Sequence, residues 1–200
     1  MRKLSAILIG MLMILCTMAV SAEAGEWRFP FGPTYVSGFS DVAELFKDNL
    51  RYKGYSVESS GGVPMGLSFH PYYQWASGLG MGLGFGPAMA IMVDSSSSDS
   101  YDLVLVPISL DVRYAFNITG SVSPYIRGGG TYLYASGDFK DSVQPGAFGA
   151  AGIEFLRNRK VSVGLEAGYD TSVVKMQRLR NNTIESIHPI GFYASLYIIF

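Results

Sequence analysis

The stretch of sequence that decides the fold is GLGMGLGFGPAMAIMV, residues 78–93. Its odd positions from 79 to 93 are all apolar, and its even positions from 78 to 90 are all Gly or Ala. Because side chains alternate between the two faces of a strand, one face carries bulky apolar groups and the other carries almost nothing. A half-buried strand of a soluble sheet would have a polar face instead. The pattern predicts a strand of a narrow closed barrel, with lipid outside and a crowded lumen inside.

Similar alternation recurs along the rest of the chain. Short turns are expected at 75–78, 117–120 and 157–160, and long connections at 39–62, 94–100, 136–144 and 171–188. Short turns that alternate with long loops are typical of outer-membrane barrels, whose turns face the periplasm. The sequence therefore predicts an all-β fold, an eight-stranded antiparallel up-and-down transmembrane β-barrel. The expected strands are residues 27–38, 63–74, 78–93, 101–116, 121–135, 145–156, 161–170 and 190–200.

Residues 41–52 follow a different period. Val42, Leu45, Phe46 and Leu50 fall near helical spacing, and Asp41-Val42-Ala43-Glu44 has the form of a capping box. We expect a short amphipathic helix in the first extracellular loop. The alternative is a core helix of a soluble domain, which fits poorly with one helix among eight strands.

The first 24 residues have the pattern of a secretory signal peptide. Arg2 and Lys3 precede a mostly apolar run, and Ala22-Glu23-Ala24 offers a cleavage site. The alternatives are a membrane anchor, for which the run is slightly short, and lipidation at Cys16, which follows a bulky Leu15. We predict a signal peptide at 1–24 and one outer-membrane β-barrel domain at 25–200.

Cleavage would leave a chain without cysteine and with little net charge. Cys16 is the only cysteine, so the mature chain can form no disulfide. The signal segment holds two of the 15 Lys and Arg and one of the 16 Asp and Glu, which leaves a net charge of −2. This balance gives no reason to expect nucleic acid. No second apolar run is long enough for a membrane-spanning helix.

The last strand carries the most specific resemblance to a known family. Apolar residues alternate along FYASLYIIF (192–200), which ends in Phe. Two further segments strengthen the resemblance: PYIRGGGTYLY (124–134) and VSVGLEAGYD (161–170). From residue 27 to 200 the chain resembles the small eight-stranded outer-membrane barrels, the family of OmpX, the OmpA transmembrane domain and the opacity proteins. It departs from them in the first-loop helix and in several strand prolines. The resemblance implies an assembly signal at Phe192, Leu196, Ile198 and Phe200.

The same resemblance implies where the protein works and what it contacts. We expect a monomer in the outer membrane of a Gram-negative bacterium, in contact with membrane lipid and lipopolysaccharide. The barrel assembly machinery would be its partner during biogenesis.

Charged residues on the inward faces predict a plugged lumen. Asp111, Arg113, Arg127, Glu154 and Glu166 would point inward in the periplasmic half, with Arg127 beside both Asp111 and Glu154. Buried charges persist when they are paired, so we expect an ionic network. The alternative is a set of simply hydrated lumen charges. An eight-stranded barrel is only wide enough for its own side chains, which argues against a diffusion pore.

The outer half of the lumen is expected to be apolar. An upper cavity suited to a hydrocarbon tail would be lined by Ala88, Ala90, Leu103, Leu105 and Leu133. Pro87 and Pro107 fall at nearly the same level of neighbouring strands and would interrupt ladder hydrogen bonds there. This arrangement resembles the lipid-handling barrels of the PagP and OmpW kinds, in which lipid or apolar solute leaves sideways. The alternative is a local bulge without functional consequence.

Three functions stay open at this point, with a non-enzymatic structural or surface-interaction barrel as the leading one. The second is a carrier of lipid or small apolar solutes. The third is a lipid-modifying enzyme, for which Glu185-Ser186-Ile187-His188 supplies hydrolase residue types without triad geometry. His70 and His188 have no metal-ligand spacing, so no metal or cofactor is expected. A soluble lipocalin-like barrel is the rival fold; its apolar residues would point inward.

Overall fold

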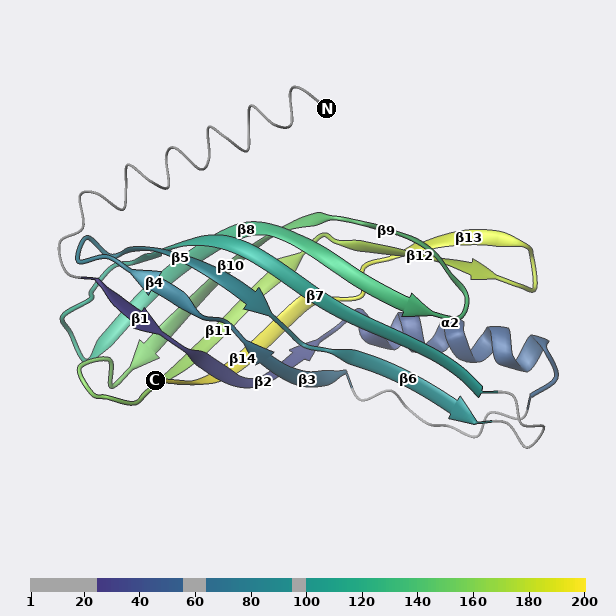
Figure 1. The fold of residues 1–200 in the computed structure, drawn as a ribbon, viewed down its shortest axis with the longest axis horizontal. Helices are drawn as coiled ribbons and strands as arrows, with labels where there is room; N and C mark the ends of the chain where they lie inside the picture. Colours follow the sequence, from purple (N-terminus) through teal and green to yellow (C-terminus); the bar gives the residue numbers. More distant parts are fainter. Residues whose placement is uncertain (1–24, 56–63, 95–99) are drawn as a thin grey trace, which may run out of the picture.

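The computed structural model describes residues 25–55, 64–94 and 100–200, which form a barrel with a small cap at one end (Figure 1). The expected signal segment, residues 1–24, lies outside the described residues. Three of the wall strands are each built from two pieces, and five are continuous. The pairs are β1 (Glu26–Arg28) with β2 (Pro30–Val36), β3 (Met65–Phe69) with β4 (Tyr72–Gln74), and β5 (Leu79–Phe85) with β6 (Met89–Asp94). The continuous strands are β7 (Ser100–Ala115), β8 (Val122–Gly137), β10 (Gly146–Phe155), β11 (Ser162–Asp170) and β14 (Gly191–Ile199).

All neighbouring wall strands are antiparallel, and the sheet closes on itself. β5 pairs with β7 on one side and with β3 and β4 on the other, and β14 returns to pair with β2. Closure satisfies backbone groups that hydrocarbon could not hydrogen-bond. The prediction of an eight-stranded antiparallel barrel is confirmed, and turns occur at the three expected places.

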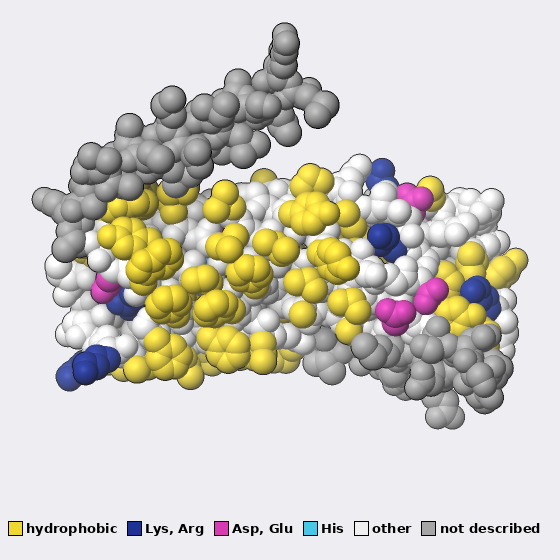
Figure 2. Space-filling view, in the orientation of Figure 1, with side chains coloured by type: hydrophobic (Ala, Val, Ile, Leu, Met, Phe, Trp, Pro, Cys, Tyr) yellow, Lys and Arg dark blue, Asp and Glu magenta, His cyan; other side chains and the backbone are white. Residues whose placement is uncertain are grey.

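The outer face of the barrel is apolar, as the alternation predicts. Leu83 and Phe85 are each 41% exposed, whereas the alternate residues of the same strand, Gly80, Gly82 and Gly84, are buried. Figure 2 shows hydrophobic side chains across the visible face of the barrel, with charged side chains gathered toward its two ends. A soluble lipocalin-like barrel would have the opposite arrangement.

The inward glycines of β5 make room for side chains from neighbouring strands. A Cβ on Gly82 would lie 2.5 Å from the His70 Nε2, and one on Gly84 would lie 2.2 Å from the Ser109 Oγ. These positions have no space for a methyl group. The inward glycines of residues 78–93 therefore indicate that the lumen beside β5 is tightly filled.

A one-residue bulge between β5 and β6 reverses the faces of this strand. Phe85 pairs with Ile108, but Met89 pairs with Leu105, so three residues of one strand oppose two of the other. An extra residue moves every following side chain to the other face. The prediction that Ala88 and Ala90 line the lumen is therefore wrong: both are exposed outward, and Met89 and Ile91 are buried inside.

A helix and three short strands form the cap at the outer end. α2 (Phe39–Tyr52) lies beside a sheet in which β12 (Val173–Arg178) stands between β9 (Lys140–Gln144) and β13 (Thr183–Ile187) (Figure 1). The connections 136–144 and 171–188, expected as loops, thus contain strands. The helix begins two residues earlier than expected, and its N-cap, Gly38, provides no side-chain hydrogen bond. The predicted capping box is wrong because Asp41 lies inside the first turn.

Asn49 fixes the helix to the cap sheet. Its amide nitrogen donates to the Gln177 carbonyl at 2.6 Å, and its amide oxygen accepts from the Leu179 backbone N–H at 2.8 Å. A buried side chain amide that satisfies two backbone groups is a specific anchor. No helix in the described part of the chain is long and apolar enough to cross a membrane.

Candidate functional site: a plugged lumen with a side cavity

Glu154 is the centre of an ion cluster at the periplasmic end of the lumen. Its carboxylate contacts Arg113 at 2.5 Å, pairs with Arg157, and lies 3.7 Å from Arg28. The Tyr72 hydroxyl donates to the same carboxylate at 2.6 Å. Glu154 and these three arginines are all buried, so each charge depends on the others for compensation.

Aromatic rings complete this end of the plug. The Arg113 guanidinium carbon lies 3.4 Å from the centroid of the Tyr125 ring and 4.5 Å from that of Tyr72. Guanidinium groups stack well on aromatic faces. Arg113 therefore contacts both an ion partner and two aromatic rings at this end of the lumen.

A second ion cluster lies above the first and is centred on Arg127. Two of its nitrogens donate to Glu166 at 2.7 Å each, and a third donates to the Asp111 Oδ2 at 3.1 Å. The His70 Nε2 lies 2.6 Å from the same Asp111 oxygen. The same His70 nitrogen lies 3.1 Å from an Arg127 nitrogen, so the ring contacts both partners of the Arg127–Asp111 pair.

The structure brings the five sequence-predicted lumen charges into these two clusters. Arg127 pairs with Asp111 as expected, but its second partner is Glu166, whereas Glu154 pairs with Arg113. Sequence reasoning missed Arg28, Arg157 and His70. Arg28 and His70 share the inward alternation of their strands, a signal that could have found them. Arg157 belongs to a turn, where alternation gives no information.

The outer half of the lumen is filled by a hydrophobic core. Leu103, Leu105 and Leu133 are buried there, as the sequence predicts, but they form one cluster with the apolar face of α2 rather than the lining of an open cavity. The predicted upper cavity is therefore wrong. The helix residues of this core are Phe39, Val42, Ala43, Leu45, Phe46 and Leu50.

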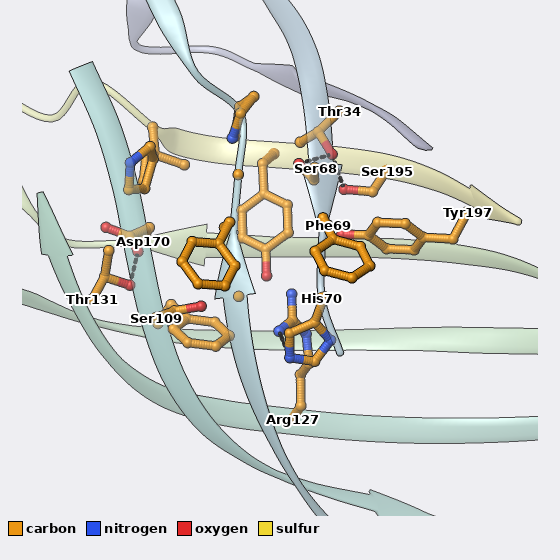
Figure 3. Close-up of a pocket in the computed structure, with 18 residues that line it drawn as sticks. Thr34, Ser68, Phe69, His70, Ser109, Arg127, Thr131, Asp170, Ser195 and Tyr197 are labelled. Carbon is orange, nitrogen blue, oxygen red and sulfur yellow. Dashed lines mark hydrogen bonds between the residues drawn. The ribbon is translucent and has the colours of Figure 1, made fainter. Parts of the chain in front are cut away.

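A cavity of about 60 Å³ remains between the ion clusters and this core (Figure 3). His70 and Arg127 border it, and Phe148 and Ile190 from the outer core also line it. Hydroxyl groups supply much of the rest: the Ser68 Oγ donates to the Thr34 Oγ1, which lies 2.7 Å from the Ser195 Oγ. The cavity thus combines polar and apolar lining at mid-barrel, whereas the outer surface and the core above are apolar.

The cavity reaches the barrel wall where the strand pairing is weakest. β3 and β5 share one residue pair, Phe69 with Phe85, and β6 pairs only with β7 among the described strands. Both Phe rings are exposed on the outer face and also line the cavity. We call this interval between β3 and β6 the side seam.

The two prolines predicted as a lateral weak point both line the cavity. Pro87 lies across the side seam from Gly66, whose added Cβ would be 2.6 Å from the Pro87 Cβ. Pro107 lies in a β7–β8 ladder that runs without interruption, and its carbonyl accepts from the Gly86 N–H at 3.2 Å. The interval in the ladder therefore lies beside Pro87 rather than beside Pro107.

Comparison with known proteins agrees with this architecture. Residues 10–186 match the family model described as outer membrane protein beta-barrel domain. The chain belongs to this family. Its members place it in the cell outer membrane, which confirms the predicted location. A search of the curated proteins finds no match.

Two solved structures share the barrel fold. OprG of Pseudomonas aeruginosa is 14% identical, with a TM-score of 0.58 over 89% of this chain and 96% of that chain. Outer membrane protein W of E. coli is 17% identical, with a TM-score of 0.51 over 89% of this chain and 98% of that chain. Identities this low establish the fold alone.

The other sequence-predicted groups do not form a chemical site. Glu185 pairs with Arg178, whereas the His188 Nδ1 faces the Ser172 carbonyl at 3.2 Å, so the Glu-Ser-Ile-His run is not assembled into a triad. Within the described residues, no group of three or more His, Cys, Asp or Glu could hold a metal ion. The four residues expected to signal assembly are all exposed: Phe192, Leu196 and Ile198 lie on β14, and Phe200 follows it directly.

Proposed function

We propose that this barrel takes up small apolar or amphipathic solutes through the side seam and does not conduct along its axis. The observation that carries the proposal is the mid-barrel cavity that reaches the wall between Phe69 and Phe85. The ion clusters below it and the α2 core above it leave the seam as the shortest route. Such a barrel is non-enzymatic, and its chemistry consists of binding and release.

A disulfide across the side seam tests this proposal. Phe69 and Phe85 are directly opposite each other at the seam, and the mature chain we expect has no cysteine of its own. Directly opposite residues of an antiparallel pair are close enough for a disulfide. The double variant Phe69→Cys/Phe85→Cys should take up hydrophobic dye into vesicles when reduced and lose uptake when oxidised. Each single variant, treated with the same oxidant, is the control. Unchanged uptake in a sample that is fully cross-linked on a gel would contradict the proposal.

A second candidate is a surface-interaction role for the cap. β13 is the outer strand of the cap sheet and pairs only with β12 among the described strands, and Ile184 on it is 57% exposed. An unpaired strand edge can add a strand from another chain. Binding to lipopolysaccharide or host molecules that is lost on deletion of residues 179–182 with β13 would support this candidate over the first.

We further propose that the protein works as a monomer in contact with lipid and lipopolysaccharide. The outward alternation of β14 supports its recognition by the barrel assembly machinery during biogenesis. Replacing Phe200 by Ser should slow insertion into outer membrane without changing the unfolding midpoint of correctly inserted barrel.

A further inference from the structure

Asp170 is a buried carboxylate without a cationic partner. The residue is 3% exposed, lines the cavity, and makes no ion pair within the described part of the chain. Its oxygens accept from the Thr131 Oγ1 at 2.6 Å (Figure 3) and from the Ser172 backbone N–H at 2.7 Å. Two neutral donors compensate a buried charge less well than a cation does.

The guanidinium that borders the same cavity already donates to other carboxylates. Arg127 shares its nitrogens between Glu166 and Asp111, two carboxylates for one guanidinium. Asp170, the carboxylate that lines the cavity, therefore has no share of this guanidinium.

Tyr193 adds an unpartnered polar group to the same cavity. It is 9% exposed, and its hydroxyl is buried without a hydrogen bond of normal geometry, although Glu166 lies within electrostatic range. A phenolic hydroxyl can accept as well as donate, as can those of Thr34, Ser68 and Ser195. The lining thus offers several oxygen acceptors near the Asp170 carboxylate.

We propose that the cavity binds a primary ammonium group carried on a short apolar chain, with Asp170 as its counter-ion. This inference rests on the proposed function and names the class of its solute. An ammonium group brings three donors and a positive charge, which match the Asp170 carboxylate and the hydroxyl acceptors near it. A carboxylate would instead meet the like charge of Asp170 in the same cavity.

The size of the cavity fits such a head group. A volume of about 60 Å³ holds roughly four or five water-sized groups. An ammonium group with a few methylenes fills it. The remaining chain would extend between Phe69 and Phe85, whose rings are exposed to lipid.

Three probes of nearly equal size test the inference on the barrel refolded into phosphatidylcholine nanodiscs. n-Propylammonium, propan-1-ol and propanoate are titrated by ligand-observed NMR, with empty nanodiscs as the blank. We expect the ammonium to bind about tenfold or more tightly than the alcohol, as loss of a charge-assisted hydrogen bond predicts, and propanoate not to bind. Equal binding of ammonium and alcohol, or binding of propanoate, would overturn the inference.

Asp170→Asn keeps the shape and removes the charge, so it should abolish the preference for ammonium. Asp141→Asn, at an exposed position of β9, is the matched control and should leave the preference unchanged. Tyr193→Phe removes only the unpartnered hydroxyl and should weaken ammonium binding several-fold. If Asp170→Asn does not fold, the result for Tyr193→Phe tests the inference in its place. Unaltered ammonium binding in folded Asp170→Asn, or in Tyr193→Phe when that variant decides, contradicts the inference.

The outcomes also separate this inference from the proposed function. Binding of propan-1-ol that is lost when the side seam is cross-linked, without preference for ammonium, would keep side access and remove the cation site. Failure of all three probes to bind would remove both.

Discussion

The periplasmic half of the lumen is filled by charged side chains, whereas the outer half is filled by apolar side chains that come partly from α2. In the first half the plug grows from the wall itself, since Arg113, Glu154 and Arg127 belong to β7, β10 and β8. In the second half the wall supplies only part of the packing. The difference teaches that one barrel can be closed in two ways. Ion pairs fill one end, a loop helix docks at the other, and a small cavity remains where the two meet.

Breaking the periplasmic plug should have the largest effect. Glu154→Ala leaves Arg113, Arg157 and Arg28 buried without their shared carboxylate, and removal of one partner of a buried ion pair costs about 3–5 kcal/mol. Urea unfolding of the barrel in vesicles measures this loss. Glu26→Ala is the control, because its side chain is 55% exposed and its pairs should contribute about 1 kcal/mol or less. Equal losses for the two variants would refute the clustered plug.

Breaking the outer plug should cost somewhat less. Leu50 is fully buried in the core between α2 and the wall, and Leu50→Ala should lose about 3 kcal/mol through lost contacts and a cavity. The cap should also become sensitive to external protease, while the Glu154 cluster stays intact. Tyr52→Ala, at a position 61% exposed, should change neither property. An outer half that tolerates Leu50→Ala would not be a packed core.

The bulge between β5 and β6 gives a sharper, smaller test of where the two halves meet. With Ala90 outside and Met89 inside, Ala90→Cys should react several-fold faster with a lipid-soluble maleimide than Met89→Cys does. Faster reaction at Met89→Cys would mean that Met89 faces the lipid and Ala90 the lumen, as uninterrupted alternation predicts.

The cap surface should show the smallest effect. Arg178 pairs with Glu185 and with Asp48 of α2, all three side chains being partly exposed, and the Glu185 carboxylate raises the pKa of Arg178 above its ordinary value. The raised pKa keeps Arg178 protonated at every pH that the barrel tolerates, so its contribution is not lost as pH rises toward alkaline values. Glu185→Gln should leave the unfolding midpoint unchanged between pH 5 and about pH 9. A clear shift would mean that the cap contributes more to stability than exposed pairs do.

The wall of this barrel could be predicted from sequence because a strand in lipid must alternate at every residue. Leu83, Phe85 and the glycines between them follow that rule, and so do the inward Asp111 and Glu154. The rule fails where one residue is inserted: Pro87 indicates a bulge only as an alternative and does not show that the following faces are reversed, so uninterrupted alternation places Ala88 and Ala90 on the wrong face.

The contents of the lumen were harder to foresee. The apolar spacing of Val42, Leu45 and Leu50 predicts a helix, but where that helix docks depends on contacts with residues far away in the chain. The partner choice of Arg127 depends on side chain reach across the lumen, which strand order alone does not give. Asp170 stands out only once its surroundings show that it makes no ion pair with any described residue, although Arg127 lines the same cavity.

The accessibility of the cavity is the most direct test of side entry into a closed lumen. Ser109 lines the cavity, and Ser109→Cys is a conservative change in a mature chain that we expect to lack cysteine. The thiol is exposed either to N-ethylmaleimide dissolved in the lipid phase or to an anionic, water-soluble methanethiosulfonate reagent. We predict reaction with the first and protection from the second. Reaction with the water-soluble reagent at an equal or faster rate would show an axial water path and contradict the account.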